Sequence, residues 1–120
     1  MRLLVCGDRD WKDERLVLLE IEHRRPEVVI EGEYRGADRA ARAAADYFGI
    51  PVLPFPADWK THGRAAGVFR NTQMLTEGKP DLVLAFHDDL ENSKGTKDMI
   101  EQATAAGIPV EIVCHEAKDE

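Results

Sequence analysis

Residues 27–55 read EVVIEGEYRGADRAARAAADYFGIPVLPF, and this stretch predicts a strand, a helix and a second strand. The apolar run at 27–31 is short and continuous, which is typical of a strand buried on both faces of a sheet. Gly49 followed by Pro51 marks the end of the helix and the start of a strand at 51–55. The helix has an apolar face that can pack closely on a sheet, formed by Ala37, Ala40, Ala41, Ala44, Tyr47 and Phe48, with Arg39, Arg42 and Asp46 outside it.

The same alternation of apolar runs and helical patterns continues along the chain. The segment Gly107-Ile108-Pro109-Val110 repeats the connection Gly49-Ile50-Pro51-Val52, and Gly78 before Pro80 predicts a third helix stop of this kind. The expected strands are 2–6, 27–31, 51–55, 81–86 and 109–113, and the other expected helices run from Asp10 or Asp13 to about Arg24, over 63–76 and over 96–106.

This order of elements predicts one Rossmann-like α/β domain over residues 1–115, with a parallel five-stranded sheet in the order 3-2-1-4-5 and helices on both faces. The acidic segment 116–120 is expected to be a frayed tail. In this strand order the first and fifth strands lie roughly 9 to 10 Å apart. Cys6 and Cys114, at the ends of those strands, would be too far apart for a disulfide.

Composition limits the class of protein. With 120 residues, of which 43% are hydrophobic, the chain is long enough for one core and too short for two ordinary domains. Its net charge of −7 at pH 7 argues against general nucleic-acid binding, because an acidic surface repels phosphate backbones. No stretch approaches the roughly 20 apolar residues that span a bilayer, and the run at 3–6 is shorter than a signal-peptide core. We therefore expect a cytoplasmic protein with no membrane segment and with reduced cysteines.

Four loops follow the expected strands, at 7–11, 31–38, 58–71 and 87–98, and they contain the most distinctive charged and aromatic residues of the chain. Loops after the carboxyl ends of parallel strands converge at one edge of the sheet, so we expect these four to form one site. In the second loop, Gly36 allows the backbone to approach a ligand closely, and the helix that begins after it directs free N–H groups toward an anion. This loop therefore predicts a phosphate-binding site.

The first two loops also have purely structural interpretations. Gly7 can form a tight strand-to-helix turn, and Asp38 can compensate the helix dipole beside an exposed Arg35. Glu31 and Glu33 can accept hydrogen bonds from a ribose or a base, or they can form a solvated rim.

The third loop has the highest density of hydrogen-bond donors, at 60–64, although Asp58 before it could simply cap the next helix. Trp11, Tyr34 and Trp59 could stack on a base, or they could complete the core at the ends of elements. Both interpretations remain open for each of these residues.

The fourth loop begins with His87, Asp88 and Asp89, which invite a metal hypothesis. These residues lack the spaced Cys or His pairs of a zinc site, so we expect no dedicated metal site and no cofactor, while a phosphate-bridging magnesium ion stays open. The chain also lacks a Ser-His-Asp arrangement, an activated cysteine and a Walker lysine, which argues against acyl transfer and P-loop hydrolysis.

Five motifs, in order along nearly the whole chain, resemble the YspA-type branch of the SLOG superfamily. They are Gly7-Asp8-Arg9-Asp10-Trp11, Gly32 with Arg35-Gly36-Ala37-Asp38, Pro56-Ala57-Asp58-Trp59, Gly63-Arg64-Ala65-Ala66-Gly67 with Arg70-Asn71, and Ser93-Lys94-Gly95-Thr96-Lys97-Asp98-Met99. This superfamily is Rossmann-like and includes the LOG phosphoribohydrolases and DprA-type proteins. The resemblance implies binding of a nucleotide or nucleotide-derived molecule, a place for Arg70 and Asn71 beside the site, and association into a homodimer.

The resemblance to LOG enzymes has a gap in the fourth loop. Those enzymes carry Pro-Gly-Gly-x-Gly-Thr-x-x-Glu, and here Gly95 and Thr96 match the opening of the helix, whereas Met99 occupies the position of the glutamate. Asp98 could replace that carboxylate only if the start of the helix shifts. The phosphate-binding part of the motif is therefore matched, whereas the glutamate at the position of Met99 is not, and the identity of a catalytic acid stays open.

We therefore expect a module that binds a nucleotide-derived small molecule as a sensor or by sequestration, with N-glycoside hydrolysis of a nucleoside monophosphate as the alternative. Hydrolysis needs a carboxylate, and the candidates are Glu31, Glu33 and Asp98. The candidate ligand-binding residues are Gly7, Asp8, Arg9, Trp11, Gly32, Tyr34, Arg35, Gly36, Asp38, Arg64, Arg70, Asn71, His87, Ser93, Lys94, Gly95 and Thr96.

Overall fold

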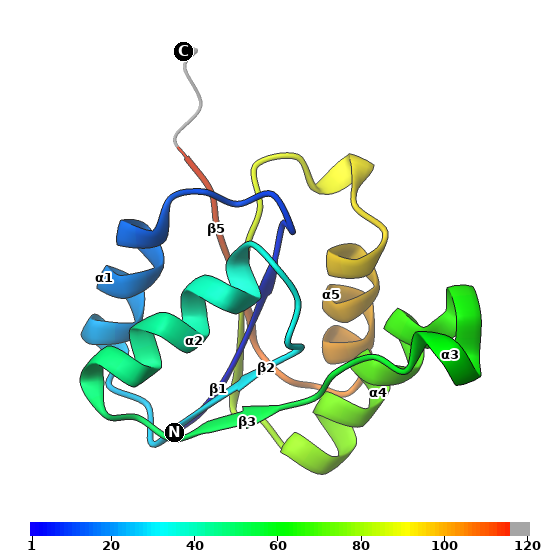
Figure 1. The fold of residues 1–120 in the computed structure, drawn as a ribbon, viewed down its shortest axis with the longest axis horizontal. Helices are drawn as coiled ribbons and strands as arrows, with labels where there is room; N and C mark the ends of the chain where they lie inside the picture. Colours follow the sequence, from blue (N-terminus) through cyan, green and yellow to red (C-terminus); the bar gives the residue numbers. More distant parts are fainter. Residues whose placement is uncertain (116–120) are drawn as a thin grey trace.

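A five-stranded parallel sheet forms the centre of the computed structural model, which describes residues 1–115 (Figure 1). The order of its strands is β3-β2-β1-β4-β5, which confirms the predicted order. The segment 116–120, expected to be a frayed tail, lies outside the described residues. The strands are β1 (Arg2–Gly7), β2 (Val28–Glu31), β3 (Val52–Pro54), β4 (Leu82–Phe86) and β5 (Val110–Val113).

Helices cover both faces of the sheet, as predicted (Figure 1). Because successive side chains of a strand point to opposite faces, Leu3 and Val5 of β1 pack on one side of the sheet and Leu4 and Cys6 on the other. The first side is covered by α1 (Glu14–Arg24) and α2 (Ala37–Phe48), and the second by α4 (Ala66–Gly78) and α5 (Gly95–Ala105).

The helix starts refine the predicted boundaries. Helix α1 begins after Asp13, whose carboxylate accepts a hydrogen bond of 3.1 Å from the N–H of Leu16, which decides between the two expected starts. The helix expected over 63–76 begins only at Ala66, after a short helix and a 3₁₀ turn, and a second 3₁₀ turn precedes α5. These short elements are α3 (Trp59–His62), η1 (Gly63–Ala65) and η2 (Leu90–Asn92).

Two predictions about single residues were wrong. Gly78 does not follow α4 as a left-handed cap: it is the last residue of the helix, and Lys79 takes the left-handed conformation with φ of 51°. Gly78 instead packs on β2, because a Cβ there would lie 3.2 Å from Ile30. Tyr47, expected on the buried face of α2, is 77% exposed, since it lies where that face ends.

The sheet opens a crevice at the carboxyl ends of its two central strands. β1 connects through α1 to β2, and β4 connects through α5 to β5, so the two connections leave in opposite directions and a topological switch lies between them. The N–H of Asp8 donates to the carbonyl of Phe86 at 2.8 Å, and this hydrogen bond holds the carboxyl ends of β1 and β4 together. Cys6 is buried and Cys114 exposed, and both are free, in agreement with the strand order. Within the described part of the chain, no helix is both long enough and apolar enough to span a bilayer.

Candidate functional site

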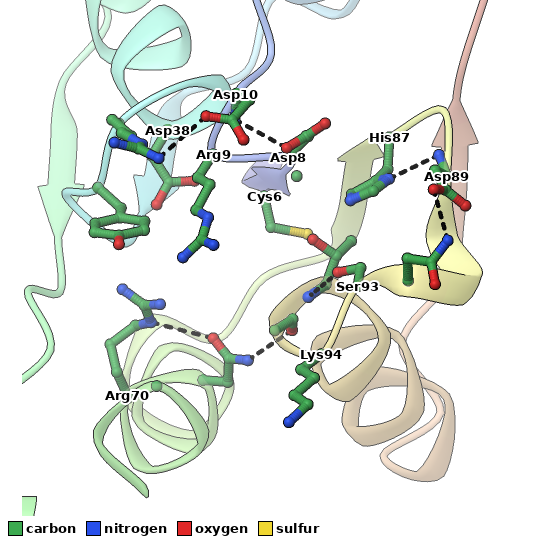
Figure 2. A pocket seen from close by; sticks show the side chains of 18 of the residues that line it. Cys6, Asp8, Arg9, Asp10, Asp38, Arg70, His87, Asp89, Ser93 and Lys94 are labelled. Atoms are coloured by element: carbon green, nitrogen blue, oxygen red, sulfur yellow. Dashed lines mark hydrogen bonds and ion pairs between the residues drawn. The ribbon is translucent and has the colours of Figure 1, made fainter. Parts of the chain in front are cut away.

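A cavity of about 610 Å³ lies at this switch point, and residues from all four predicted loops line it (Figure 2). From the loop after β1 it is lined by Gly7, Asp8 and Arg9, and from the loop after β2 by Tyr34, Arg35 and Asp38. Arg70 and Asn71 line it from α4, and the loop between β4 and α5 contributes His87, Ser93, Lys94, Gly95 and Thr96. The remaining candidates, Trp11, Gly32, Gly36, Arg64, Glu31, Glu33 and Asp98, do not line this cavity.

Trp11 belongs to the core. It is 7% exposed, its indole N–H donates to the carbonyl of Asp13 at 2.9 Å, and its ring packs edge-on against Phe86. On its other side it stacks on His115, with ring centroids 4.9 Å apart. The packing interpretation therefore describes Trp11 better than stacking on a base.

The two predicted loop glycines hold protein segments together. A Cβ on Gly36, which has φ of 72°, would lie 2.3 Å from the carbonyl oxygen of Asp8, and a Cβ on Gly7 would lie 2.2 Å from that of Phe86. The N–H of Ala37, at the start of α2, donates to the carbonyl of Asp8 at 3.1 Å. The loop after β1 thus lies against the start of α2 and accepts the N–H of Ala37, so this N–H is not available to the anion expected there.

One face of α4 forms the floor of the cavity. The guanidinium of Arg70 donates to the carbonyl of Gly32 at 2.7 Å and to the side-chain oxygen of Asn71 at 3.1 Å. Asn71 donates in turn to the carbonyl of Gly95 at 3.2 Å and to Asp98 at 3.0 Å. This chain of hydrogen bonds connects the loop after β2 with the start of α5.

The start of α5 presents polar groups to the cavity. The Oγ of Ser93 accepts a hydrogen bond of 3.0 Å from the N–H of Thr96. The N–H groups of Gly95 and Lys97 have no acceptor among residues 1–115, as is usual in the first turn of a helix. No atom lies within 4 Å of the position that a Cβ on Gly95 would take. Lys94 adds a positive charge beside this turn.

The candidate catalytic carboxylates all form hydrogen bonds or ion pairs with other residues of the protein. Glu31 is 1% exposed and accepts hydrogen bonds from the N–H of Glu33 at 2.6 Å and from Arg42 at 3.3 Å. Burial raises the pKa of Glu31, and Arg42 opposes this rise. Arg42 also pairs with Glu33 at 3.3 Å, so the expectation that Arg42 lies free on the solvent face of α2 was wrong. Asp98 accepts hydrogen bonds from Asn71 and, at 2.8 Å, from Gln102.

Three buried titratable groups do face the cavity. Burial raises the pKa of Asp38 to about 7, although the positive charge of Arg70 lowers it. Burial also raises the pKa of the Cys6 thiol, which therefore stays protonated. His87 is 8% exposed, and its Nδ1 accepts a hydrogen bond of 2.9 Å from the N–H of Asp89, so the proton of the neutral ring lies on Nε2. No group of three or more His, Cys, Asp or Glu residues within 1–115 is arranged to hold a metal ion.

Several lining residues were not among the candidates. Gly67 and Met74 of α4 line the cavity with Arg70 and Asn71, and their spacing of i, i+3, i+4 and i+7 is a signal that could have found them. Trp59 was considered only for stacking, and Arg64, in the neighbouring 3₁₀ turn, is exposed and outside the cavity. The other additions are Cys6, Asp10, Asp89 and Asn92, which flank predicted residues in the first and fourth loops.

Comparisons with known proteins connect this site to a family. The family model described as YspA, cpYpsA-related SLOG family matches residues 1–62, which include the loops after β1 and β2. The gene 61 protein of Mycobacterium phage D29 is 40% identical over 119 residues, and the alignment covers 91% of this chain and 93% of the phage protein. That alignment extends beyond the half that the family model matches.

Proposed function

The chain belongs to the YspA, cpYpsA-related SLOG family, and we propose that it binds a nucleotide or nucleotide-derived small molecule in this cavity, as a sensor or a sequestering module. The observation that carries the proposal is the start of α5, where Ser93, Lys94, Gly95 and Thr96 line a cavity at the topological switch of the sheet and the N–H of Gly95 has no acceptor among residues 1–115. Ligands of open parallel α/β sheets bind at this position.

The phosphate end of the ligand is assigned to this first turn. Helix α5 has 11 residues, and its dipole and the free N–H of Gly95 favour an anion. Arg9 adds a positive charge from the opposite wall and forms no hydrogen bond or ion pair with the described residues. Figure 2 shows its side chain extending into the cavity, across from Ser93.

The nucleoside end of the ligand is assigned to the wall near α3. Tyr34 and Trp59 both line the cavity, with ring centroids 6.4 Å apart. Tyr34 is 41% exposed and Trp59 is 51% exposed, so an aromatic base has access to their faces. Stacking on such rings is favourable for any base.

Binding without turnover is favoured by the positions of the carboxylates. Met99, which occupies the position of the LOG glutamate, is fully buried in the core under α5. Asp98 is held by two amide side chains, and Glu31 and Glu33 are held by Arg42 outside the cavity. These groups are therefore poorly placed to act on a ligand.

N-glycoside hydrolysis of a nucleoside monophosphate is the second candidate function, and Asp38 is the observation in its favour. In this reaction water adds to the anomeric carbon, the bond to the base breaks, and the base leaves with a proton. A carboxyl group that lines the cavity and has a pKa of about 7 is suited to moving that proton at neutral pH.

The binding proposal is tested by calorimetric titration with the 5′-monophosphates of adenosine, guanosine, cytidine and uridine. We expect at least one to bind, and Arg9→Ala to weaken its affinity about tenfold or more by removing a charge-assisted contact. Arg39→Ala, an exposed arginine of α2 outside the cavity, is the matched control and should leave the affinity unchanged. Failure of all four nucleotides to bind would refute the proposal.

The two candidate functions are separated by incubating the protein with the same nucleotides and measuring free base by chromatography. We expect no release beyond the background rate. Release of more than one base per protein molecule, lost in Asp38→Asn, would instead establish the hydrolase.

A further inference from the structure

Asp38 differs from the other aspartates that line the cavity. It is 7% exposed, and no Lys, Arg or His among the described residues forms an ion pair or a side-chain hydrogen bond with it. The other three have partners: Asp8 accepts from the N–H of Asp10 at 2.9 Å, Asp10 pairs with Arg35 at 3.1 Å, and Asp89 accepts from Asn92 at 2.8 Å.

Arg70, whose positive charge acts on Asp38, forms its hydrogen bonds with other groups. Arg70 directs its N–H groups to the carbonyl of Gly32 and to Asn71, so it stabilises the Asp38 carboxylate by its field without donating to it. The backbone N–H groups of Gly32 and Tyr34 also face this carboxyl group. A carboxylate offers about four lone-pair sites, so acceptor capacity remains on the cavity side.

The charged and titratable groups around Asp38 come from three further elements. They are Cys6 of β1, Glu31 of β2 and Arg70 of α4. Burial and the negative charge of Glu31 raise the pKa of Asp38, and Arg70 lowers it. An ionised carboxylate buried with so little compensation is costly, and a donor from a ligand would remove part of that cost.

Resting on the proposed function, we infer that Asp38 determines ligand specificity by accepting hydrogen bonds from the sugar hydroxyls of the ligand in its ionised form, so that binding releases a proton. The site then selects an anionic ligand with a vicinal diol, such as a ribonucleotide. Inorganic phosphate, or a nucleotide whose sugar lacks these hydroxyls, would bind at the α5 end alone.

Proton release has a defined pH range. Below the pKa of about 7, Asp38 is mostly protonated, and a ligand that binds the carboxylate must displace that proton. Above pH 8 the group is already ionised, so binding releases no proton from it. The affinity should therefore rise from pH 6 to pH 8, and the contribution of the ligand phosphate to this pH dependence is measured in a variant that lacks the carboxylate.

The test compares a ribonucleoside 5′-monophosphate that binds with its 2′,3′-dideoxy analogue, by calorimetry at pH 6.5 in two buffers of different ionisation enthalpy. For the wild type we expect at least a tenfold preference for the ribonucleotide and a net release of protons on binding. In Asp38→Asn we expect the preference to fall below about threefold and the release attributable to this group to vanish. Asp46→Asn, exposed near the end of α2 and outside the cavity, is the control and should behave as the wild type.

The outcomes distinguish this inference from the proposed function. Binding of the nucleotide with equal affinity for both sugars, or without proton release, would overturn the role of Asp38 and leave nucleotide binding intact. Absence of all nucleotide binding would overturn both. If Asp38→Asn does not fold, as judged by circular dichroism, the sugar preference and the buffer dependence of the wild type still decide the question.

Discussion

Gly36 shows how a single residue joins two loops of the site. It has φ of 72°, and a Cβ there would lie 2.3 Å from the carbonyl oxygen of Asp8 and 2.4 Å from the carbonyl carbon of Arg9. Both the backbone conformation and the space therefore require glycine. This residue positions Arg9 and Tyr34 on the two sides of the cavity by holding their loops in contact.

Gly36→Ala should destabilise the protein by about 3 kcal/mol or more, because a backbone with φ of 72° and ψ of −124° costs a residue with a Cβ about 1 to 3 kcal/mol and the overlap with the loop adds to it. Gly49→Ala is the control for a positive φ without overlap: its φ is 70° and its ψ 27°, in the left-handed region, and nothing lies within 4 Å of the added Cβ. It should cost only about 1 to 2 kcal/mol. Urea unfolding of both variants measures the difference, and equal losses would mean that the loop simply moves aside.

Arg42 and Glu31 form a partly buried ion pair beside the site. Glu31 is 1% exposed, whereas the side chain of Arg42 is 41% exposed. Removing Arg42 would leave a buried carboxylate with the N–H of Glu33 as its main partner. The cost of such a change falls mainly on the group that stays buried.

Arg42→Ala should therefore reduce the free energy of unfolding at pH 8 by about 1 to 2 kcal/mol, a value below that of a fully buried pair because solvent screens the arginine. Adding Glu31→Gln should restore part of the loss, since the uncompensated charge is then gone. Arg39→Ala on the same helix, where the arginine is exposed, should change the stability by less than about 0.5 kcal/mol. A loss in Arg42→Ala no larger than in Arg39→Ala would contradict a role for the pair.

At the scale of elements, His115 ties the end of β5 to the start of α1. Its ring lies between two carboxylates, with Nδ1 2.7 Å from Asp88 and Nε2 2.8 Å from Asp13. Asp13 is also the N-cap of α1, and Trp11 stacks on one face of the imidazole. The short edge strand β5 is thus held by side chains as well as by its pairing with β4.

This cluster should make the thermal stability depend on pH. Hydrogen bonds to Asp88 and Asp13 raise the pKa of His115 from its ordinary value of 6.5, and the same contacts lower the pKa values of both aspartates. The contribution of protonated His115 is fully present below pH 6.5 and is lost as the pH rises through its raised folded pKa. The contribution of the carboxylates is present above about pH 4 and is lost on acidification.

His115→Gln should therefore lower Tm at pH 5.5 and have a smaller effect at pH 9, as measured by differential scanning fluorimetry. His23→Gln, an exposed histidine of α1, is the control and should have a small effect at both pH values. A loss of Tm in His115→Gln that is the same at both pH values would mean that packing on Trp11, and not charge, provides the stabilisation.

At the scale of the whole molecule, we expect two copies of the chain to associate. The α3 and α4 region exposes Trp59, Val68 and Phe69, at 51%, 48% and 55%, and in Figure 1 α3 lies at the margin of the molecule. Sedimentation equilibrium should give a mass of about 27 kDa, twice the 13.5 kDa of one chain. A mass of 13.5 kDa at high protein concentration would exclude the homodimer.

The architecture was largely predictable because the signals that define it are local. Each buried strand is a short apolar run, and Gly49 and Gly107 before their prolines mark the turns from helix to strand. The helix after β2 was predicted from Ala spacing, and its buried alanines match that face. Gly78 was misread, because a glycine that packs on Ile30 and a glycine that caps a helix look the same in sequence.

The site was predictable at the level of loops and less so at the level of roles. Most predicted ligand residues line one cavity, since parallel strands bring their carboxyl ends to one edge. The sequence alone could not reveal that the N–H of Ala37, at the start of α2, donates to Asp8, whereas Gly95, at the start of α5, lines the cavity with its N–H free. Both helices begin with the same kind of glycine-containing motif.

The sequence by itself determined the number, order and type of the main elements, the parallel sheet and the absence of a Cys6–Cys114 bridge, because periodicity, helix stops and strand order suffice for these. Only the tertiary structure decided which charges are compensated. Glu31 at the end of β2 and Asp38 in the first turn of α2 are both buried carboxylates. Arg42 pairs with Glu31, whereas Asp38 faces the cavity without such a partner. The physical reason is that desolvation and charge pairing depend on residues distant in sequence, which come together only when the sheet and helices have packed.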